Sequence, residues 1–247
     1  MAFSGAFVKP FRPALDTGAA AAVAYYYNVY SASSPYTYIN AGSGASIDNL
    51  TAGAFTVEAW VRKIGAGQSS QGAICAKGQG ANGFWFHTTG SGGGNVRAEI
   101  VGATTWGSTY TANGTLLIDG NWHHVAMCYD NTGSRKAEIF IDGTKPTYIA
   151  YTAVVGAVVS DAAYNLSVGA IYQGSLYNWD GYIGWLRISN IVRYTTNFTP
   201  IVRCAPPATD ANTMLLYQLS EGSGTAITDN SGSSNNGTLT NGSWAAC

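Results

Sequence analysis

Hydrophobic and polar positions alternate along much of the segment 36–200. The phrase FTVEAWVR at 55–62 places Phe, Val, Ala and Val on one face and Thr, Glu, Trp and Arg on the other. HHVAMCY at 123–129 alternates in the same way. A period of two residues is typical of a β-strand with one buried face. These stretches are therefore predicted to be strands that cover a core.

Further strands follow from the same rule. In YIGWLRI at 182–188, strict alternation places Ile183, Trp185 and Arg187 on one face. AEIFI at 137–141 runs into an Asp-Gly dipeptide, which favours the positive φ angles of a type I′ hairpin turn. Turn signals recur through the segment, and no long stretch has the period of a helix. The pattern predicts an all-β sandwich.

The regions on either side of this segment differ from it. Residues 1–35 lack alternation and are rich in Ala, Tyr, Ser and Pro. We predict that they form an assembly arm or docking segment through bunched tyrosines: Tyr25, Tyr26, Tyr27 and Tyr30. A disordered leader is the alternative, although disordered segments are usually poor in aromatic residues. Residues 36–247 are predicted to form one domain, and 212–247 contain the strongly apolar stretch MLLYQL.

Charged side chains are scarce. They make up 10% of the chain, whereas an ordinary soluble domain has roughly 25%. Aromatic residues reach 13%, with 16 Tyr and 7 Trp. A surface of this kind suits assembly interfaces or neutral polar ligands such as sugars. The formal net charge of −1 provides no basic surface for phosphates, so we do not expect nucleic acid as a partner.

The amino-terminal segment lacks the features of an export signal. Such a signal needs an uninterrupted apolar core, and here Lys9, Pro10 and Arg12 interrupt it. No stretch approaches about 18 apolar residues, so no membrane span is expected. We expect a protein that is made in a host cytosol and released as part of a particle, with an extracellular location as the alternative.

The four cysteines fall into two groups. Cys75 and Cys128 lie inside strand-like phrases and are predicted to be buried free thiols. Cys204 and Cys247 lie outside the strand core. They can form a disulfide with each other or with a neighbouring subunit, and the sequence does not choose between these. No Cys/His cluster has the spacing of a zinc site.

Four phrases occur in a fixed order: FTVEAWVRK at 55–63, GNWHHVAMCYD at 120–130, EIFIDGTKP at 138–146 and DGYIGWLRISN at 180–190. In order and spacing they resemble the laminin-G-like (concanavalin-A-like) jelly-roll family. The resemblance covers about 36–244 and implies an antiparallel two-sheet jelly-roll sandwich. Residues 212–247 resemble the family's opening strands but come last. We expect them to complete the same sandwich as in a circular permutation; donation to a neighbouring subunit is the alternative.

Catalysis is not expected. Retaining glycosidases of this fold need two carboxylates about 5 Å apart, and the nearest candidates are Glu138 and Asp142. Asp142 belongs to the turn dipeptide, and no third carboxylate completes the family's catalytic phrase. His123 and His124 resemble structural imidazoles that are bonded within the sheet, and no GxSxG motif accompanies them.

Glycan binding is more plausible than catalysis. Aromatic faces stack on sugar rings, and the Gly-rich stretches between strands hold five candidates: Trp106, Tyr110, Tyr172, Tyr177 and Trp179. Of these, Trp106 and Trp179 are preferred because each lies in a Gly/Ser/Asn/Thr context. The alternative is that these rings fill the core or a subunit contact.

A calcium ion at the rim is the one cofactor that the family resemblance leaves open. Its loose candidates are Asp48, Asn49 and Asp180. They lack the dense oxygen-ligand spacing of a dedicated calcium loop. No other cofactor is expected.

The phrase RISNIVRYTTNFTP at 187–200 resembles a sub-type of the family that is common in structural proteins of tailed bacteriophages. It implies a non-catalytic protein on the virion exterior, in capsid decoration or as a tail or fibre accessory. Its partners would be other virion proteins, copies of itself, and a cell-surface polysaccharide if it binds glycans. A free extracellular lectin or carbohydrate-binding module is the alternative, and a glycoside hydrolase is disfavoured.

Overall fold

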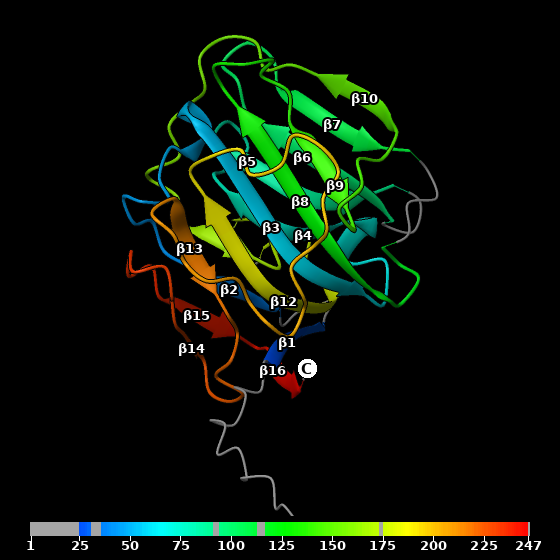
Figure 1. Ribbon diagram of the computed structural model, residues 1–247, viewed down its shortest axis with the longest axis vertical. Helices are drawn as coiled ribbons and strands as arrows, with labels where there is room; N and C mark the ends of the chain where they lie inside the picture. Colours follow the sequence, from blue (N-terminus) through cyan, green and yellow to red (C-terminus); the bar gives the residue numbers. More distant parts are fainter. Residues whose placement is uncertain (1–24, 31–35, 91–93, 113–116, 173–174, 247) are drawn as a thin grey trace, which may run out of the picture.

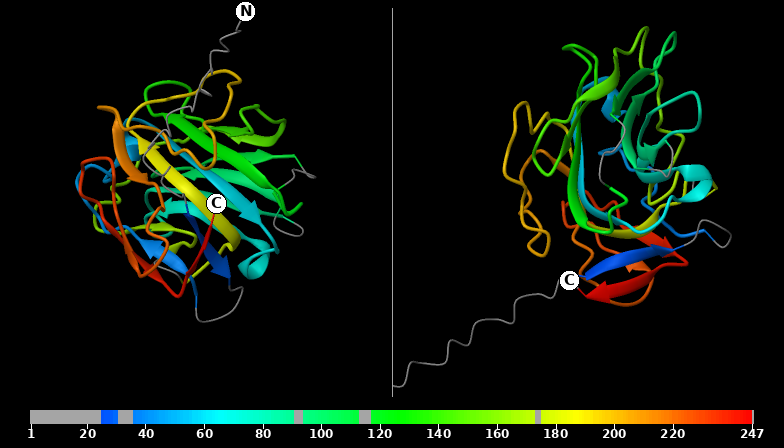
Figure 2. Two further views of the ribbon diagram at one scale, coloured as in Figure 1. Left: turned by 60° about the horizontal axis from the view of Figure 1, so that its bottom comes forward. Right: turned by 90° about the vertical axis from the view of Figure 1, so that its right-hand side faces the viewer.

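The computed structural model describes residues 25–30, 36–90, 94–112, 117–172 and 175–246, which form two antiparallel sheets packed face to face (Figures 1 and 2). Sheet A has seven strands in the order β16-β1-β12-β3-β8-β9, with β13 also paired to β12. Sheet B has nine strands in the order β10-β7-β6-β5-β4-β11-β2-β15-β14. The predicted all-β, two-sheet jelly-roll class is confirmed.

Sheet A consists of β1 (Tyr25–Tyr30), β3 (Ala54–Lys63), β8 (Trp122–Asp130), β9 (Glu138–Ile141), β12 (Asp180–Ser189), β13 (Thr213–Tyr217) and β16 (Ser243–Ala246). Sheet B consists of β2 (Tyr38–Asn40), β4 (Gly72–Lys77), β5 (Phe84–Thr89), β6 (Asn95–Ile100), β7 (Gly107–Thr111), β10 (Tyr148–Thr152), β11 (Leu166–Val168), β14 (Ala226–Ile227) and β15 (Gly237–Thr240). The helices in the described ranges are the 3₁₀ turns η1 (Leu50–Ala52) and η2 (Gln68–Ser70). Neither is long or apolar enough to cross a membrane.

The core lies between the sheets and is lined by alternate residues of each strand. In β3, Phe55, Val57, Ala59 and Val61 are fully buried there, as the alternation predicts. Sheet B contributes its own inward-facing side chains from the opposite layer: Phe84, Phe86, Val96, Ala98 and Ile100. Burial of this apolar surface is the main force that holds the two sheets together.

Strand β12 departs from strict alternation. Its register against β3 shifts between Ile183 and Leu186. Ile183, Leu186 and Ile188 therefore all belong to the core, whereas Trp185 and Arg187 lie on the outer face. The predicted grouping of Ile183 with Trp185 and Arg187 is wrong because a β-bulge inserts an extra residue and reverses the alternation after it.

The predicted turn after β9 is confirmed. Asp142 has φ 50° and Gly143 has φ 74°, the two positive values that a type I′ turn requires. A Cβ atom at position 143 would lie 1.9 Å from the carbonyl oxygen of Phe198. Glycine is therefore required here both by the backbone angle and by the close passage of a later segment.

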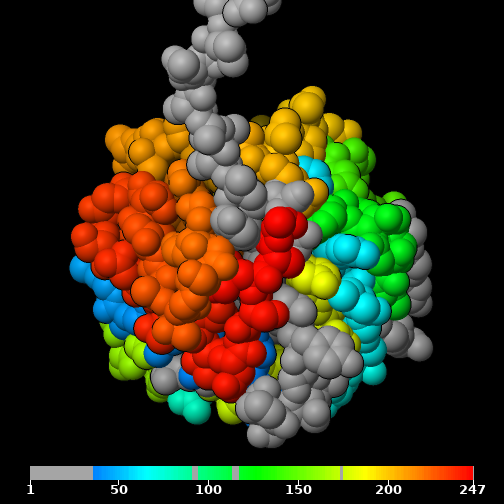
Figure 3. Space-filling model, turned by 90° about the horizontal axis from the view of Figure 1, so that it is seen from below, coloured from blue at the N-terminus to red at the C-terminus, as the bar shows by residue number. Residues whose placement is uncertain are grey.

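Both ends of the described chain add strands to the sandwich. Residues 25–30, predicted as part of a separate arm, instead form β1 between β12 and β16, where their backbone groups find partners. The remainder of the predicted arm, 1–24 and 31–35, lies outside the described residues. Residues 213–246 place β13 and β16 in sheet A and β14 and β15 in sheet B. Figure 3 shows this carboxyl-terminal region, orange to red, gathered on one face.

A long segment, residues 190–206, crosses the outer face of sheet A, and we call it the strap (Figure 2). Its side chains Val192, Tyr194 and Phe198 pack on a small apolar cluster of β8 and β9: Ala126, Cys128 and Phe140. Two indoles of the sheet bond to its backbone. Trp60 Nε1 donates to the carbonyl of Ile201 at 2.8 Å, and Trp185 Nε1 to that of Val202 at 3.3 Å.

Beneath the strap lies Glu58, a fully buried carboxylate. Its Oε1 accepts hydrogen bonds from Nε and Nη2 of Arg187 at 2.7 and 2.6 Å. Its Oε2 accepts one from the Tyr194 hydroxyl at 2.8 Å and lies 3.1 Å from Nε2 of His124. Burial alone would raise the pKa of Glu58. The hydrogen bond with His124 and the charge of Arg187 outweigh burial and hold the pKa below its ordinary value.

We expect Glu58→Gln to lower the free energy of unfolding by about 3–5 kcal/mol, because Arg187 is then left buried without its counter-charge. Urea unfolding measures this. Asp210→Asn is the matched control, since Asp210 is 44% exposed at its side chain and pairs with the strap residue Arg193 at 2.8 Å. Its loss should cost under about 1 kcal/mol.

Wild-type protein and Glu58→Gln also test the pH dependence. Because the folded-state pKa of Glu58 is lowered, its contribution is complete above the unfolded-state pKa of about 4.3 and is lost as the pH falls through the folded-state pKa. Wild-type stability should therefore fall more steeply on acidification than that of Glu58→Gln. Equal slopes would contradict an ionised Glu58.

Candidate functional site

The outer face of sheet B carries a group of aromatic rings that no strap covers in the described part of the chain. In β5, alternation turns Phe84 and Phe86 inward and Trp85 and His87 outward. On the neighbouring strands, Glu99 pairs with Trp85, Arg97 with His87, and Tyr110 with Arg97. We call the rings on this side the aromatic face: Trp85, Trp106, Tyr110, Tyr172 and Tyr177.

Trp85 lies at the centre of the aromatic face and is 8% exposed. Trp106 meets it edge-on with centroids 5.1 Å apart, and Tyr172 does so at 5.6 Å. Tyr177 stacks on His87 at 5.8 Å with only 11° between the planes. The buried Trp85 and His87 thus hold the half-buried outer rings in fixed orientations, which favours ligand stacking on their free sides.

The loop after β11 positions two of these rings. Tyr172 and Tyr177 have φ of 51° and 53°, a left-handed conformation that is costly for residues with a side chain. The amide of Ala73 in β4 donates to the Tyr177 carbonyl at 2.7 Å, and the amide of Ile171 donates to the Leu176 carbonyl at 2.9 Å. Ala73 is small enough for the loop to pack directly on the sheet. These contacts maintain the unfavourable backbone angles and present both rings.

A polar group adjoins the rings. Glu99, 5% exposed at its side chain, accepts from Nη2 of Arg97 at 2.7 Å and lies 2.9 Å from Nε2 of His87. Arg97 is 34% exposed at its side chain, donates from Nε to the Ser108 hydroxyl at 3.2 Å, and lies over the Tyr110 ring at 5.7 Å. The guanidinium is therefore held in one place with its charge balanced by Glu99. Such an arrangement can offer hydrogen bonds to hydroxyl groups beside stacking rings.

The structure brings together most of the predicted glycan-binding residues but rejects one. Trp106, Tyr172 and Tyr177 share one cluster, and Tyr110 lies beside it across Arg97. The prediction that Trp179 is a glycan-binding residue at the surface is wrong. It is 0% exposed and packs in the core, with Nζ of Lys63 4.6 Å from its ring centroid. Its Gly- and Asn-rich surroundings form the connection into β12, which directs the indole between the sheets.

Four residues of this face were not among the predicted ones: Trp85, His87, Arg97 and Glu99. Their signal was present in the chain. FWFHTT at 84–89 and NVRAEI at 95–100 alternate, and that alternation places these four side chains on one outward face.

The calcium candidates do not form a site in this structure. Asn49 lies just before η1 and β3, whereas Asp180 lies beside the far end of β3, where Gly181 pairs with Lys63. Asp48 Oδ1 already accepts from the ammonium of Lys77 at 2.8 Å. Among the described residues, no group of three or more His, Cys, Asp or Glu could hold a metal. The three predicted calcium ligands therefore do not lie together.

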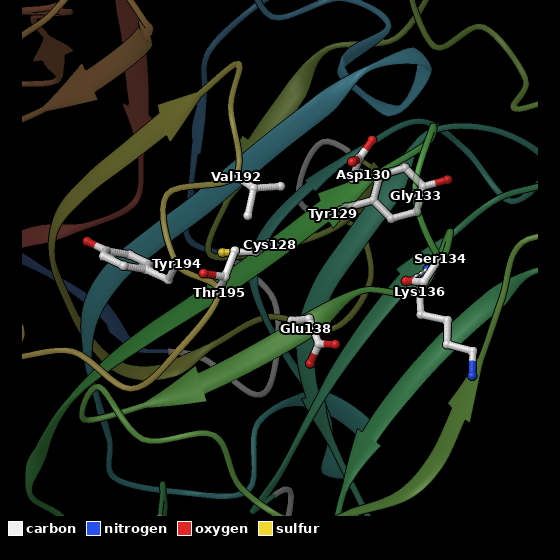
Figure 4. A pocket seen from close by; sticks show the side chains of 10 residues that line it. All are labelled: Cys128, Tyr129, Asp130, Gly133, Ser134, Lys136, Glu138, Val192, Tyr194 and Thr195. Carbon is white, nitrogen blue, oxygen red and sulfur yellow. Dashed lines mark hydrogen bonds between the residues drawn. The ribbon is translucent and has the colours of Figure 1, made fainter.

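A pocket of about 290 Å³ lies on the outer face of sheet A beside the strap (Figure 4). Strap residues Val192, Tyr194 and Thr195 lie on one side of it, and Ser134 and Lys136 on the other. Its thiol, Cys128, is buried, and burial raises its pKa to about 11, which makes it a poor nucleophile. The pocket offers polar groups but no activated one.

The two carboxylates considered for catalysis are engaged in structural contacts. Glu138 bonds the hydroxyls of Tyr148 and Tyr151 and lies 2.5 Å from Nζ of Lys145. Asp142 accepts from the His124 amide at 2.9 Å and lies 2.7 Å from Nδ1 of His123. That hydrogen bond outweighs burial and raises the pKa of His123. The imidazoles lie within the sheet network, as predicted.

The cysteines follow the expected division in part. Cys75 and Cys128 are free and buried, which confirms their prediction. Cys204 is disulfide-bonded. Cys247 lies outside the described residues, so the pairing of these two stays a prediction.

Comparison with known proteins identifies the fold. Residues 33–197 match the model of the concanavalin A-like lectin/glucanases superfamily. This chain is similar to the structure of a protein from Bacteroides ovatus that is assigned as carbohydrate-binding. The two share 15% identity with a TM-score of 0.64, and the match covers 91% of this chain and 60% of that one. This chain thus spans only 60% of the length of that protein. No curated protein matches the chain.

Two further structures are more distant. The heptameric SAP-like pentraxin of Limulus polyphemus has 11% identity and a TM-score of 0.49, with 70% of this chain and 78% of that one covered. Domains LG4-5 of the mouse laminin alpha1 chain have 15% identity and a TM-score of 0.45, with 82% and 53% covered. At these identities the likeness concerns the fold alone.

Two tryptophan substitutions test the corrected assignment. Trp179→Ala should lower the free energy of unfolding by about 3–5 kcal/mol, because it empties a fully buried position. Trp106→Ala should cost clearly less, because its indole is half-buried at the surface. Chemical denaturation of both variants checks this. A reversed order would contradict the placement of the two rings.

Proposed function

We propose that this chain, which belongs to the concanavalin A-like lectin/glucanases superfamily, binds carbohydrate on the aromatic face of sheet B. One observation carries the proposal: the half-buried rings of Trp106, Tyr172 and Tyr177 surround a buried ring, beside the fixed pair Arg97–Glu99. Rings that stack on sugar faces and fixed polar groups that bond hydroxyls are the two elements of sugar recognition.

The charge balance of the aromatic face supports a neutral ligand. Arg97 is paired with Glu99 at 2.7 Å, so its positive charge is largely cancelled where a ligand would lie. An anionic sugar would have to compete with a carboxylate that is already in place. Neutral hexoses within a surface polysaccharide are therefore the proposed ligand class.

A non-catalytic role fits the state of the carboxylates. Glu138 is bonded to two phenols and an ammonium, and Asp142 to the His123 ring and a backbone amide. Neither is free to protonate a leaving group or attack a sugar, which is what a glycosidase pair must do. Glu99 is likewise held by Arg97 and His87.

We further propose that the protein is an exterior component of a tailed-bacteriophage particle, as capsid decoration or a tail or fibre accessory. The phrase RISNIVRYTTNFTP at 187–200 supports this through its resemblance to phage structural proteins. The low charge content also supports it, because little electrostatic repulsion opposes close packing of copies. Other virion proteins and further copies of this chain are the proposed partners. A free extracellular lectin remains the second candidate.

Glycan binding can be tested with Trp106→Ala against an array of neutral and acidic oligosaccharides, followed by calorimetry with each hit. We expect wild-type protein to bind neutral glycans. The variant should bind them about ten-fold more weakly, which corresponds to a loss of about 1.4 kcal/mol of binding free energy from stacking. Trp122→Ala is the matched control, a half-buried indole on sheet A that lies 4.7 Å from the Arg203 guanidinium. Equal loss in both variants, or loss in neither, would count against the aromatic face.

The particle role calls for a separate measurement. Quantitative mass spectrometry of density-banded particles should find this chain at a fixed ratio to the major capsid or tail protein. Recovery only as free protein outside the particles would instead support the extracellular lectin. Since the glycan array is run on purified protein, its outcome is independent of this one.

A further inference from the structure

One lysine lies at the end of the sandwich in surroundings made of oxygen atoms. Lys77 ends β4 and is 0% exposed. Its Nζ donates to Asp48 Oδ1 at 2.8 Å, to the Ser43 hydroxyl at 3.0 Å and to the Tyr164 carbonyl at 2.6 Å. An ammonium has three protons, and each of these has an acceptor.

The acceptors come from separate segments, which the ammonium joins. Ser43 and Asp48 belong to the loop between β2 and η1, whereas Tyr164 belongs to the loop that leads into β11. The Ser43 hydroxyl also lies 2.7 Å from Asp48 Oδ1 and 2.7 Å from the Ala162 carbonyl. Lys77 is thus the centre of a contact that fixes two loops against sheet B.

A second carboxylate adjoins this cluster. Asp161 is 0% exposed, and its Oδ1 accepts from the Asn49 amide at 2.7 Å. Its Oδ2 is buried and has no hydrogen-bond partner among the described residues. Burial raises the pKa of Asp161, and the positive charge of Lys77 acts in the opposite direction. Asp161 therefore presents a buried oxygen without a partner in the described part of the chain, in a segment that bonds to Asn49, the residue next to Asp48.

We propose that the Lys77 ammonium is a tethered cation that takes the place a divalent metal would otherwise fill, and that its removal opens a calcium site. Carboxylate, hydroxyl and carbonyl oxygens are the ligands that calcium takes. With Lys77 in place, the two carboxylates are already supplied with a positive charge. The loops of the wild-type protein are then organised without a metal ion.

Lys77 also influences the edge of the aromatic face, although the proposed role of its ammonium does not depend on glycan binding there. A small pocket of about 50 Å³ is lined by Gly78, Gln79, Tyr164, Asn165 and Tyr172. The Tyr164 carbonyl accepts a hydrogen bond from the Lys77 ammonium, and Tyr172 belongs to the aromatic face. The lysine therefore orders the loop that borders that ring.

The first experiment compares wild-type protein with Lys77→Gln in thermal melts, in EDTA and in calcium chloride. Wild-type Tm should be equal in both within about 1 °C, since no site is open to the ion. In EDTA, Lys77→Gln should melt roughly 10 °C lower, because two carboxylates lose their counter-charge. Calcium should restore a large part of that loss in the variant alone.

Direct binding and two further variants complete the test. Calorimetry with calcium should detect one site in Lys77→Gln and none in wild-type protein. The double variant Lys77→Gln with Asp48→Asn should lose both binding and rescue. Lys145→Gln is the control, because Lys145 is 43% exposed and pairs with Glu138 at the surface. It should respond to neither reagent.

Two results would overturn the proposal. A wild-type protein that melts lower in EDTA, or that binds calcium at a site sensitive to Asp48→Asn, would show that the lysine does not replace a metal. A Lys77→Gln variant that calcium neither binds nor stabilises would show that the cluster is not a cation site. The wild-type measurements decide the first point even where the variant fails to fold.

Discussion

Glu58 constrains the whole of sheet A, because an ionised carboxylate on the outer face of a sheet has to be either solvated or fully paired. Here it is paired, by Arg187 and Tyr194 and by the ring of His124. Tyr194 belongs to the strap, so the strap must lie across the sheet for the set to be complete. Once there, its half-buried Phe198 packs on the apolar cluster of β8 and β9. The polar contact and the apolar cover are each incomplete without the other.

That arrangement decides which face is available for recognition. The strap occupies much of the outer side of sheet A, and the indole of Trp60 bonds to it through Nε1. On sheet B the corresponding side carries rings that are only half covered, around Trp85. The two faces are thus specialised, one for covering buried charge and one for exposing ordered aromatic surface.

Local pattern predicted the parts of the structure that depend on local chemistry. The inward faces of β3 and β8 and the Asp142 turn followed from periodicity and turn preference. The bulge in β12 did not follow in this way, because only the pairing with β3 reveals the extra residue. For Trp179, neighbouring Gly and Asn indicate a connection but not the direction in which the indole points.

Two buried lysines illustrate the kind of contact that the sequence could not predict. Lys63 has no hydrogen-bond partner for Nζ among the described residues, and burial lowers its pKa to about 8 although the charge of Asp180 acts against this. Lys77 is surrounded by oxygens. Lys63 ends its strand directly after Arg62, and Lys77 ends its strand as the one basic residue in it. The environments of both come from loops far away in the sequence. Long-range contacts of this kind leave no trace in a local pattern.

The pairing of β1 with β16 has a consequence for attachment. Tyr25 lies opposite Ala246, so both ends of the described strands leave from one edge of sheet A, whereas the aromatic face belongs to sheet B. A tether at either end would therefore start from sheet A and not from the strands that carry the aromatic face. Copies anchored side by side would then present their faces to one long polymer, and each further contact would form at an effective concentration in the millimolar range. If the aromatic face binds glycans as proposed, avidity of this kind would allow many weak contacts to hold a repeating polysaccharide.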